Sequence, residues 1–160
     1  SAHGEPNAAV IGWLGTYAVA EPGLRLGAHA TVLLDARNEV QPDAILFREE
    51  PGGPRLSPDD YVEGAPQLVV EVAASSASYD LHEKEAYRRN GVREYVVWRV
   101  LDQALDWFEL RDGVYVRREP DADGVIESAT FPGLRLHVPS LLAGDAAGVL
   151  AAVRPSGTPR

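Results

Sequence analysis

The spacing of apolar residues predicts a helix at the start of the chain and strands after it. Between residues 7 and 20, four apolar side chains recur on one helical face: Val10, Trp13, Leu14 and Tyr17. Asn7 stands where an N-cap residue would begin this helix. The segments 29–35 and 43–49 are typical of short strands, the second because small or polar residues alternate with apolar ones.

Turn-forming residues surround these first strands. Segment 21–27 is typical of a turn, and segment 50–66 contains four prolines and three glycines with no clear period, which indicates a surface loop. Residues 67–74 then form the clearest strand pattern, rich in β-branched residues and bounded by turn formers. Its near-continuous apolar character predicts a central strand that is covered on both faces.

A helix is expected from about residue 81 to residue 90. Asp80 and Glu83 have the spacing of a capping box at its start, and Gly91 stands where a glycine commonly ends a helix. The run that follows, residues 93–101, is typical of a buried strand.

The last third of the chain is rich in strand patterns. Residues 104–119 predict a hairpin with Asp112 and Gly113 as its turn. Residues 124–142 add one or two strands, and a short helix with a Pro/Gly/Ser tail ends the chain. This order predicts an α/β (α+β) fold, with a mixed central sheet flanked by helices and a β-rich C-terminal part.

The length of 160 residues suits one domain with one sizeable core. We expect a single domain at 1–150 and a flexible tail at 151–160. The chain opens on "SAHGEPNAAV" without an initiator Met, so we also expect that an N-terminal piece is missing.

Composition narrows the classes of function. The sequence has no cysteine, which excludes disulfides, thiolate metal sites and cysteine nucleophiles. It contains no signal-peptide pattern and no apolar run of the roughly 18 residues that a membrane span needs, so we expect a cytoplasmic protein without a membrane partner. The formal net charge of −9 argues against a generally basic surface for nucleic acids.

Two carboxylates stand out from their surroundings. Glu71 interrupts the apolar run "LVVEVA", and a buried carboxylate is costly unless something pairs with it. Strand alternation places it on the same face as Val69 and Ala73. Asp43 follows Pro42 at the opening of another strand, where a simple turn role is the alternative.

Lys84 is the single lysine of the chain, in which every other non-histidine basic residue is an arginine. A solvated helix lysine paired with Asp80 or Glu83 is the plain alternative. Arginine replaces lysine where only a positive charge is needed, but it does not supply a compact ammonium with movable donors. Together with Asp43 and Glu71, this lysine would supply the residue types that metal-assisted phosphodiester hydrolysis needs.

The same residues carry a resemblance to a known family. The stretches "QPDAILF", "GAPQLVVEVAASSASYDLHEKEAYRRNGVREYVVWRV", "DWFELRDGVYV" and "FPGLRLHVPSLL" resemble the Uma2 family (DUF820) of restriction-endonuclease-like proteins, within the PD-(D/E)XK nuclease superfamily. The resemblance implies the fold of that superfamily and a hydrolase that cuts DNA with Mg²⁺ or Mn²⁺.

The resemblance also implies a role for individual residues. Asp43 matches the Asp of the PD motif, and Glu71 matches the acidic residue of (D/E)xK. Ala73 occupies the position of the superfamily's usual lysine, and Lys84, on the following helix, takes its place. The backbone carbonyl of Val72 would be a further metal ligand beside the Asp43 and Glu71 carboxylates.

Two functions follow as hypotheses. The first is a metal-dependent endonuclease acting on DNA, with Asp43, Glu71 and Lys84 as catalytic residues. The second is a non-catalytic or regulatory binding module on the same fold, working as a homodimer, which the acidic charge favours. The first requires both carboxylates to lie close enough to share one cation.

The four histidines lack ligand spacing and are expected at the surface: His3, His29, His82 and His137.

Overall fold

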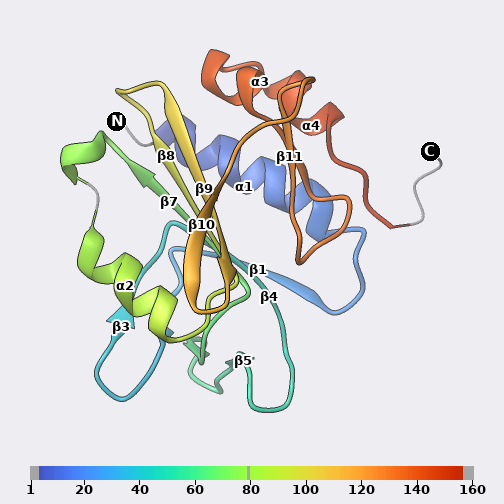
Figure 1. The fold of residues 1–160 in the computed structure, drawn as a ribbon. Helices are drawn as coiled ribbons and strands as arrows, with labels where there is room; N and C mark the ends of the chain where they lie inside the picture. Colours follow the sequence, from blue (N-terminus) through green and yellow to red (C-terminus); the bar gives the residue numbers. More distant parts are fainter. Residues whose placement is uncertain (1–3, 79, 157–160) are drawn as a thin grey trace.

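A mixed six-stranded sheet forms the centre of the protein (Figure 1). We describe it from a computed structural model, which covers residues 4–78 and 80–156. The central strands β7 and β8 run parallel, and each remaining neighbour in the sheet is antiparallel. The strand order across the sheet is β1 (Leu24–Ala28), β4 (Ala44–Arg48), β7 (Leu68–Ala73), β8 (Glu94–Arg99), β9 (Ala104–Arg111) and β10 (Val114–Arg118).

Helices cover both faces of this sheet, as the sequence predicted. The first helix, α1 (Gly4–Ala18), packs on one face, and α2 (Leu81–Arg89) packs on the other (Figure 1). Alternate residues of β7 divide between the two cores, so that Val70 lies in the core with α1 and Val69 lies in the core with α2. Glu71 therefore faces the α2 side, as the alternation required.

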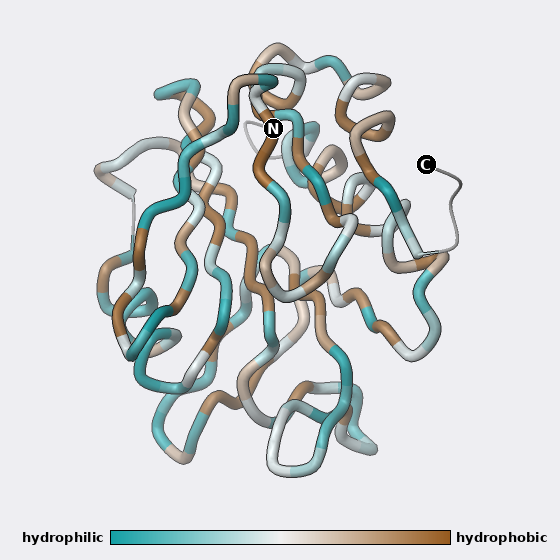
Figure 2. The backbone as a smooth tube through the Cα atoms, turned by 45° about the vertical axis from the view of Figure 1, so that its right-hand side comes forward, coloured by the Kyte–Doolittle hydropathy of each residue, from teal (hydrophilic) through white to brown (hydrophobic). Residues whose placement is uncertain are grey.

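The buried face of α1 is the one that the helical spacing of apolar residues predicted. Its buried residues are Val10, Trp13, Leu14 and Tyr17. Trp13 meets Trp107 of β9 edge to face at 5.9 Å and donates its indole N–H to the Arg135 carbonyl. Figure 2 shows the hydrophobic segments concentrated in the interior strands and the hydrophilic ones in the outer loops. The N-cap prediction for Asn7 is wrong, because the helix already begins at Gly4.

The region between residues 21 and 66 differs most from expectation. The segment 21–27, predicted as a turn, contains the edge strand β1, and only Val32–Leu33 of the segment 29–35 is a strand (β2). The glycine at position 27 lowers strand propensity, but a Cβ there would meet the Ile45 side chain at 2.9 Å, so the close pairing with β4 requires it.

The proline-rich segment 50–66 also contains short strands. These are β5 (Arg55–Leu56) and β6 (Val62–Glu63). They belong to a second, four-stranded sheet, in which the strand order is β3 (Glu39–Val40), β2 (Val32–Leu33), β6 and β5. Strands of two residues have no usable period, so only their tertiary pairing reveals them.

The helix before β8 begins and ends as its sequence indicated. The Asp80 carboxylate accepts a hydrogen bond from the Glu83 N–H at 2.9 Å, which caps α2. Gly91 follows the helix with a φ of 79°, in the left-handed region that glycine favours. A short 3₁₀ turn, η1 (Ser76–Ser78), lies between β7 and α2.

The C-terminal part adds a small sheet and two short helices. Its elements are β11 (Val125–Glu127), β12 (Arg135–His137), α3 (Val138–Ala143) and α4 (Ala146–Ala151). The predicted tail at 151–160 is packed against the domain as far as it is described, because Val153 is buried and the Ser156 N–H donates to the Glu21 carboxylate. Residues 157–160 lie outside the described part.

No helix within residues 4–78 and 80–156 is both long and apolar enough to cross a bilayer.

Candidate active site

Asp43, directly before β4, lies opposite Glu71 of the neighbouring strand β7. The antiparallel pairing of β4 with β7 matches Ala44 to Val70, so one residue further the same register brings Asp43 to Glu71. A side-chain hydrogen bond between the two carboxyls is among the influences on Glu71. The structure therefore brings together two acids that are far apart in the sequence.

The Asp43 carboxylate is held by the backbone. Its Oδ2 accepts a hydrogen bond from the Val72 N–H at 2.7 Å. Its Oδ1 lies 3.7 Å from the His29 Nδ1, and the His29 N–H donates to the Asp43 carbonyl at 3.0 Å. His29 has a φ of 52°, which is uncommon for a residue other than glycine and costs on the order of 1 kcal/mol.

The Glu71 carboxyl is half-buried and held by a tyrosine. Its Oε1 accepts a hydrogen bond from the Tyr87 hydroxyl at 3.0 Å. Burial raises the pKa of Glu71 to about 8, and the charges of Asp43 and Glu83 add to the rise. The Tyr87 hydrogen bond opposes it, whereas the hydrogen bond with Asp43 favours the protonated form. Without a metal, this environment favours the protonated form of Glu71 near neutral pH.

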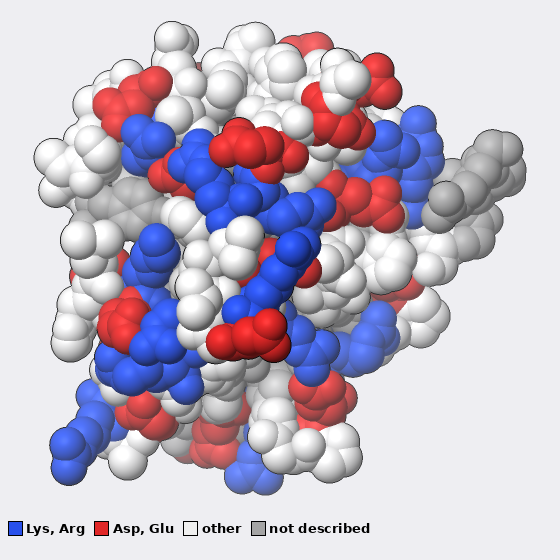
Figure 3. All heavy atoms as spheres, in the orientation of Figure 1, with Lys and Arg blue, Asp and Glu red and all other residues white. Residues whose placement is uncertain are grey.

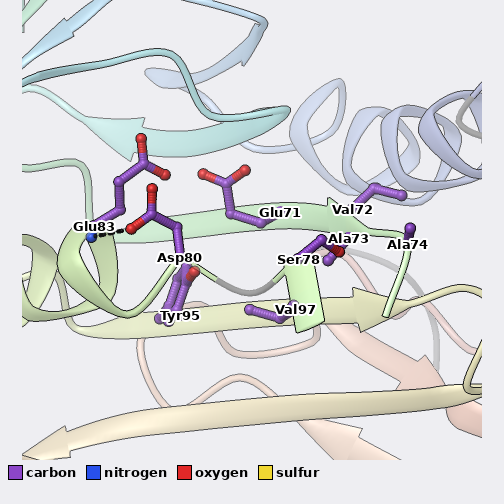
Figure 4. Close-up of a pocket in the computed structure, with 9 residues that line it drawn as sticks. All are labelled: Glu71, Val72, Ala73, Ala74, Ser78, Asp80, Glu83, Tyr95 and Val97. Carbon is purple, nitrogen blue, oxygen red and sulfur yellow. Dashed lines mark hydrogen bonds between the residues drawn. The ribbon is translucent and has the colours of Figure 1, made fainter. Parts of the chain in front are cut away.

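A cavity of about 290 Å³ opens beside Glu71 between β7 and the start of α2. Figure 4 shows the side chains of Glu71 and Glu83, from these two elements, extending in the same direction. The residues that line the cavity are Glu71, Val72, Ala73, Ala74, Ser78, Asp80, Glu83, Tyr95 and Val97. The cavity therefore has an acidic end, where positive charge is favoured.

Glu83 lines the cavity as well, although its sequence pattern indicated only a capping role. The pattern assigned it to the cap of α2, and it does supply the capped N–H. Its side chain also lines the cavity, and burial followed by the charges of Asp80 and Asp43 raises its pKa. The direction of this side chain depends on how α2 packs on the sheet, so no local spacing could have revealed it.

Lys84 lies on the same side of the sheet as Glu71, but its ammonium lies over β9, two strands away from the β7 strand that carries Glu71. Its Nζ is 3.7 Å from the centroid of the Phe108 ring on β9. The pairing of β7, β8 and β9 puts Glu71, Val97 and Asp106 in one row, and Phe108 follows Asp106 on the same face. Burial lowers the pKa of Lys84, and the Asp106 charge opposes this shift.

The histidines have different surroundings. His29 is exposed, as expected, but lies beside Asp43, a proximity set by the pairing of β1 with β4. His82 is exposed on α2. His137 is half-buried and caps α3, where its Nδ1 lies 2.6 Å from the Ser140 Oγ. His3 lies outside the described residues.

The donor set fits a hard divalent cation that keeps several waters. Within residues 4–78 and 80–156, no group of three or more His, Cys, Asp or Glu side chains is arranged to hold a metal ion. Asp43 and Glu71 supply two carboxylates, and Mg²⁺ is commonly held by one or two carboxylates with water completing its shell. Burial and the neighbouring charge of Asp43 raise the pKa of Glu71, so that positive charge beside this carboxyl would be favourable.

Comparison with known proteins indicates a family and a fold. The model of the Uma2 family, described as "Putative restriction endonuclease", matches residues 1–139. Among solved structures, a nuclease described as putative and belonging to DUF820, from Anabaena variabilis ATCC 29413, aligns with a TM-score of 0.67 at 10% identity. The alignment covers 89% of this chain and 81% of that one. At this identity the likeness shows the fold alone. A search of curated proteins found no match.

Proposed function

This chain belongs to the Uma2 family, whose description is "Putative restriction endonuclease", and on that basis we propose that it is a metal-dependent endonuclease that hydrolyses DNA phosphodiester bonds. The nuclease-like fold with its mixed sheet agrees with the fold expected from the sequence. Mg²⁺ or Mn²⁺ is the proposed cofactor, and Asp43, Glu71 and Lys84 are the proposed catalytic residues.

The observation that carries the proposal is the arrangement of the two acids. Val72 occupies one oxygen of Asp43, and Tyr87 occupies one oxygen of Glu71. The second oxygens, Oδ1 of Asp43 and Oε2 of Glu71, are the proposed ligands of a shared cation, with the His29 Nδ1 3.7 Å from that Oδ1. The Val72 backbone carbonyl would be the third ligand from the protein.

The cation would supply Lewis-acid chemistry: it lowers the pKa of a bound water and polarises a phosphoryl oxygen. The protein's own residues would do the rest. Asp43 and Glu71 fix where the scissile phosphate sits relative to the sheet. Lys84, on the same side, would orient the attacking water or stabilise negative charge on the phosphate with its ammonium.

Local charge supports the approach of a polyanion despite the net charge of −9. Figure 3 shows Lys and Arg side chains gathered on the face that carries α2 and β10, with acidic side chains between them. The basic residues of these two elements are Lys84, Arg88, Arg89, Arg117 and Arg118. Arg89 is exposed, whereas Arg88 pairs with Glu85 and also donates to the Gly113 carbonyl at 2.9 Å.

The alternative function is a non-catalytic binding module on the same fold. It is favoured by the acidic composition and by the ion pairs that engage basic residues on this face, such as Arg117 with Asp106. A cleavage assay separates the two functions, because only the enzyme needs the cation and the acid pair.

The test is nicking of supercoiled plasmid and cleavage of single-stranded DNA by the full chain with Mn²⁺ or Mg²⁺. We expect activity in the wild type and its loss in Asp43→Asn and Glu71→Gln. Glu63→Gln is the matched control, since Glu63 pairs with Arg55 at the surface of the smaller sheet. If DNA stays intact with the wild type at every metal and protein concentration, or if all variants cut equally, the enzymatic proposal fails.

A further inference from the structure

Tyr87 stands behind the acid pair and contacts it from α2. Its side chain is fully buried, with 0% of its surface exposed, although it ends in a polar hydroxyl. That hydroxyl donates to the Glu71 Oε1 at 3.0 Å, across 16 residues of sequence. The contact joins the helix to the central strand at the point where the strand carries its carboxyl.

We propose that Tyr87 is a positioning residue, which fixes the orientation of Glu71 so that its other oxygen, Oε2, is presented to the cation shared with Asp43. The inference rests on the proposed function and deepens it. Outer hydrogen bonds to metal-ligating side chains commonly set their orientation, and removing one typically costs about 10- to 100-fold in metal affinity or activity.

The backbone of Tyr87 is held in place at the end of α2. The Val92 N–H donates to the Tyr87 carbonyl at 3.0 Å. Asn90 donates its side-chain amide both to the Ala86 carbonyl and to the Asp35 carboxylate, each at 2.9 Å. The second bond ties the end of the helix to the turn between β2 and β3. The helix therefore has little freedom to move Tyr87 away from Glu71.

The ring of Tyr87 is held by aromatic packing. It lies 5.1 Å from the ring of Tyr95, centroid to centroid, within a cluster that also contains Phe108 and Tyr115. A ring fixed in this way gives its hydroxyl a single direction, so the hydrogen bond selects one rotamer of Glu71.

The plain alternative is that the bond only satisfies two buried polar groups. Tyr115 provides a matched control for it, since its hydroxyl donates to the Val92 carbonyl at 2.8 Å from within the same aromatic cluster. Tyr87→Phe and Tyr115→Phe each remove one hydroxyl and one hydrogen bond, and each keeps the ring.

The experiment is calorimetric titration of Mn²⁺ into the full chain, with nicking rates measured over a range of Mn²⁺ concentrations. We expect Tyr87→Phe to weaken Mn²⁺ binding about 10-fold or more, and to regain much of its nicking rate at high Mn²⁺. Tyr115→Phe should bind Mn²⁺ within about twofold of the wild type. Equal affinity in the wild type and both variants would overturn the positioning role alone, whereas absence of Mn²⁺ binding in the wild type would overturn the proposed function.

A second measurement tests the contact without metal. Urea unfolding midpoints are compared for Tyr87→Phe, Glu71→Ala and the double variant, in the presence of a chelator. A non-additive midpoint is expected for this pair, and an additive one for Tyr115→Phe with Glu71→Ala, because contacting residues couple and separate ones do not. Additivity for Tyr87 and Glu71 would show that the hydroxyl does not hold the carboxyl, and the inference would fall.

Discussion

The Val72 backbone N–H donates to the Asp43 carboxylate at 2.7 Å, so the strand that carries Glu71 also orients the other acid of the site. Val72 is the residue directly after Glu71, and successive side chains of a strand point to opposite faces. The Val72 side chain packs in the core on the α1 face of the sheet, while its backbone N–H binds the Asp43 carboxylate. The site is thus built into the centre of the sheet.

Glu71 should limit the stability of the metal-free protein above neutral pH. Its folded-state pKa of about 8 lies above the value of 4.5 expected when unfolded, so its favourable contribution is complete below pH 4.5 and is lost as pH rises to 8. We expect Glu71→Gln to raise the free energy of unfolding at pH 9 by on the order of 3 kcal/mol. Urea denaturation with a chelator measures this.

The gain should shrink as the pH falls and disappear near pH 4. Glu63→Gln, at the surface of the smaller sheet, should give no comparable gain at any pH. If Glu71→Gln is no more stable than the wild type at pH 9, burial does not raise the pKa of Glu71 as inferred.

Metal binding should stabilise the wild type through the same acid pair. A ligand that binds only the folded state at 100 times its Kd adds about 2.7 kcal/mol. We expect Mn²⁺ to raise the Tm of the wild type by several degrees, and to leave Asp43→Asn and Glu71→Gln unchanged. Differential scanning fluorimetry checks this, with a chelator reversing the shift. An equal shift in all three proteins would indicate binding elsewhere.

Lys84 should affect the rate of cleavage more than metal binding. We expect Lys84→Arg to keep a cation near Phe108 but to lower the nicking rate about 10- to 100-fold at saturating Mn²⁺, since its planar fork does not replace the movable donors of an ammonium. Arg89→Lys, an exposed exchange on the same helix, is the control. An unchanged nicking rate in Lys84→Arg would show that Lys84 only packs over the Phe108 ring and does not assist cleavage.

Glu94 should be required for stability rather than for chemistry. Its carboxylate is fully buried and accepts hydrogen bonds from the Trp107 indole at 3.2 Å, from the Ala129 N–H at 3.0 Å and from the Ser128 hydroxyl. We expect Glu94→Ala to destabilise the fold by about 3 kcal/mol, because these donors lose their partner. Urea denaturation measures the loss, and Glu119→Ala, at an exposed position, should change stability by less than about 0.5 kcal/mol.

Much of the fold follows from local patterns in the sequence. The face of α1, the caps of α2 and the turn at Asp112 and Gly113 were predicted because each depends on residues within one turn or one hairpin. Strand β1 and the short strands of the smaller sheet were not, since their stability comes from pairing partners far away in sequence. A dimer, a cytoplasmic location and the boundary of the domain at residue 150 stay predictions.

The sequence by itself determined which residues are candidates for the chemistry, since a carboxylate inside an apolar strand and a lone lysine are visible as exceptions to a pattern. Only the tertiary structure decided which residues lie together. The pairing of β4 with β7 sets Asp43 against Glu71, and the packing of α2 adds Tyr87 and Glu83. Register and helix packing are set by the whole core, because each depends on contacts between distant segments, and a local pattern contains no record of those contacts.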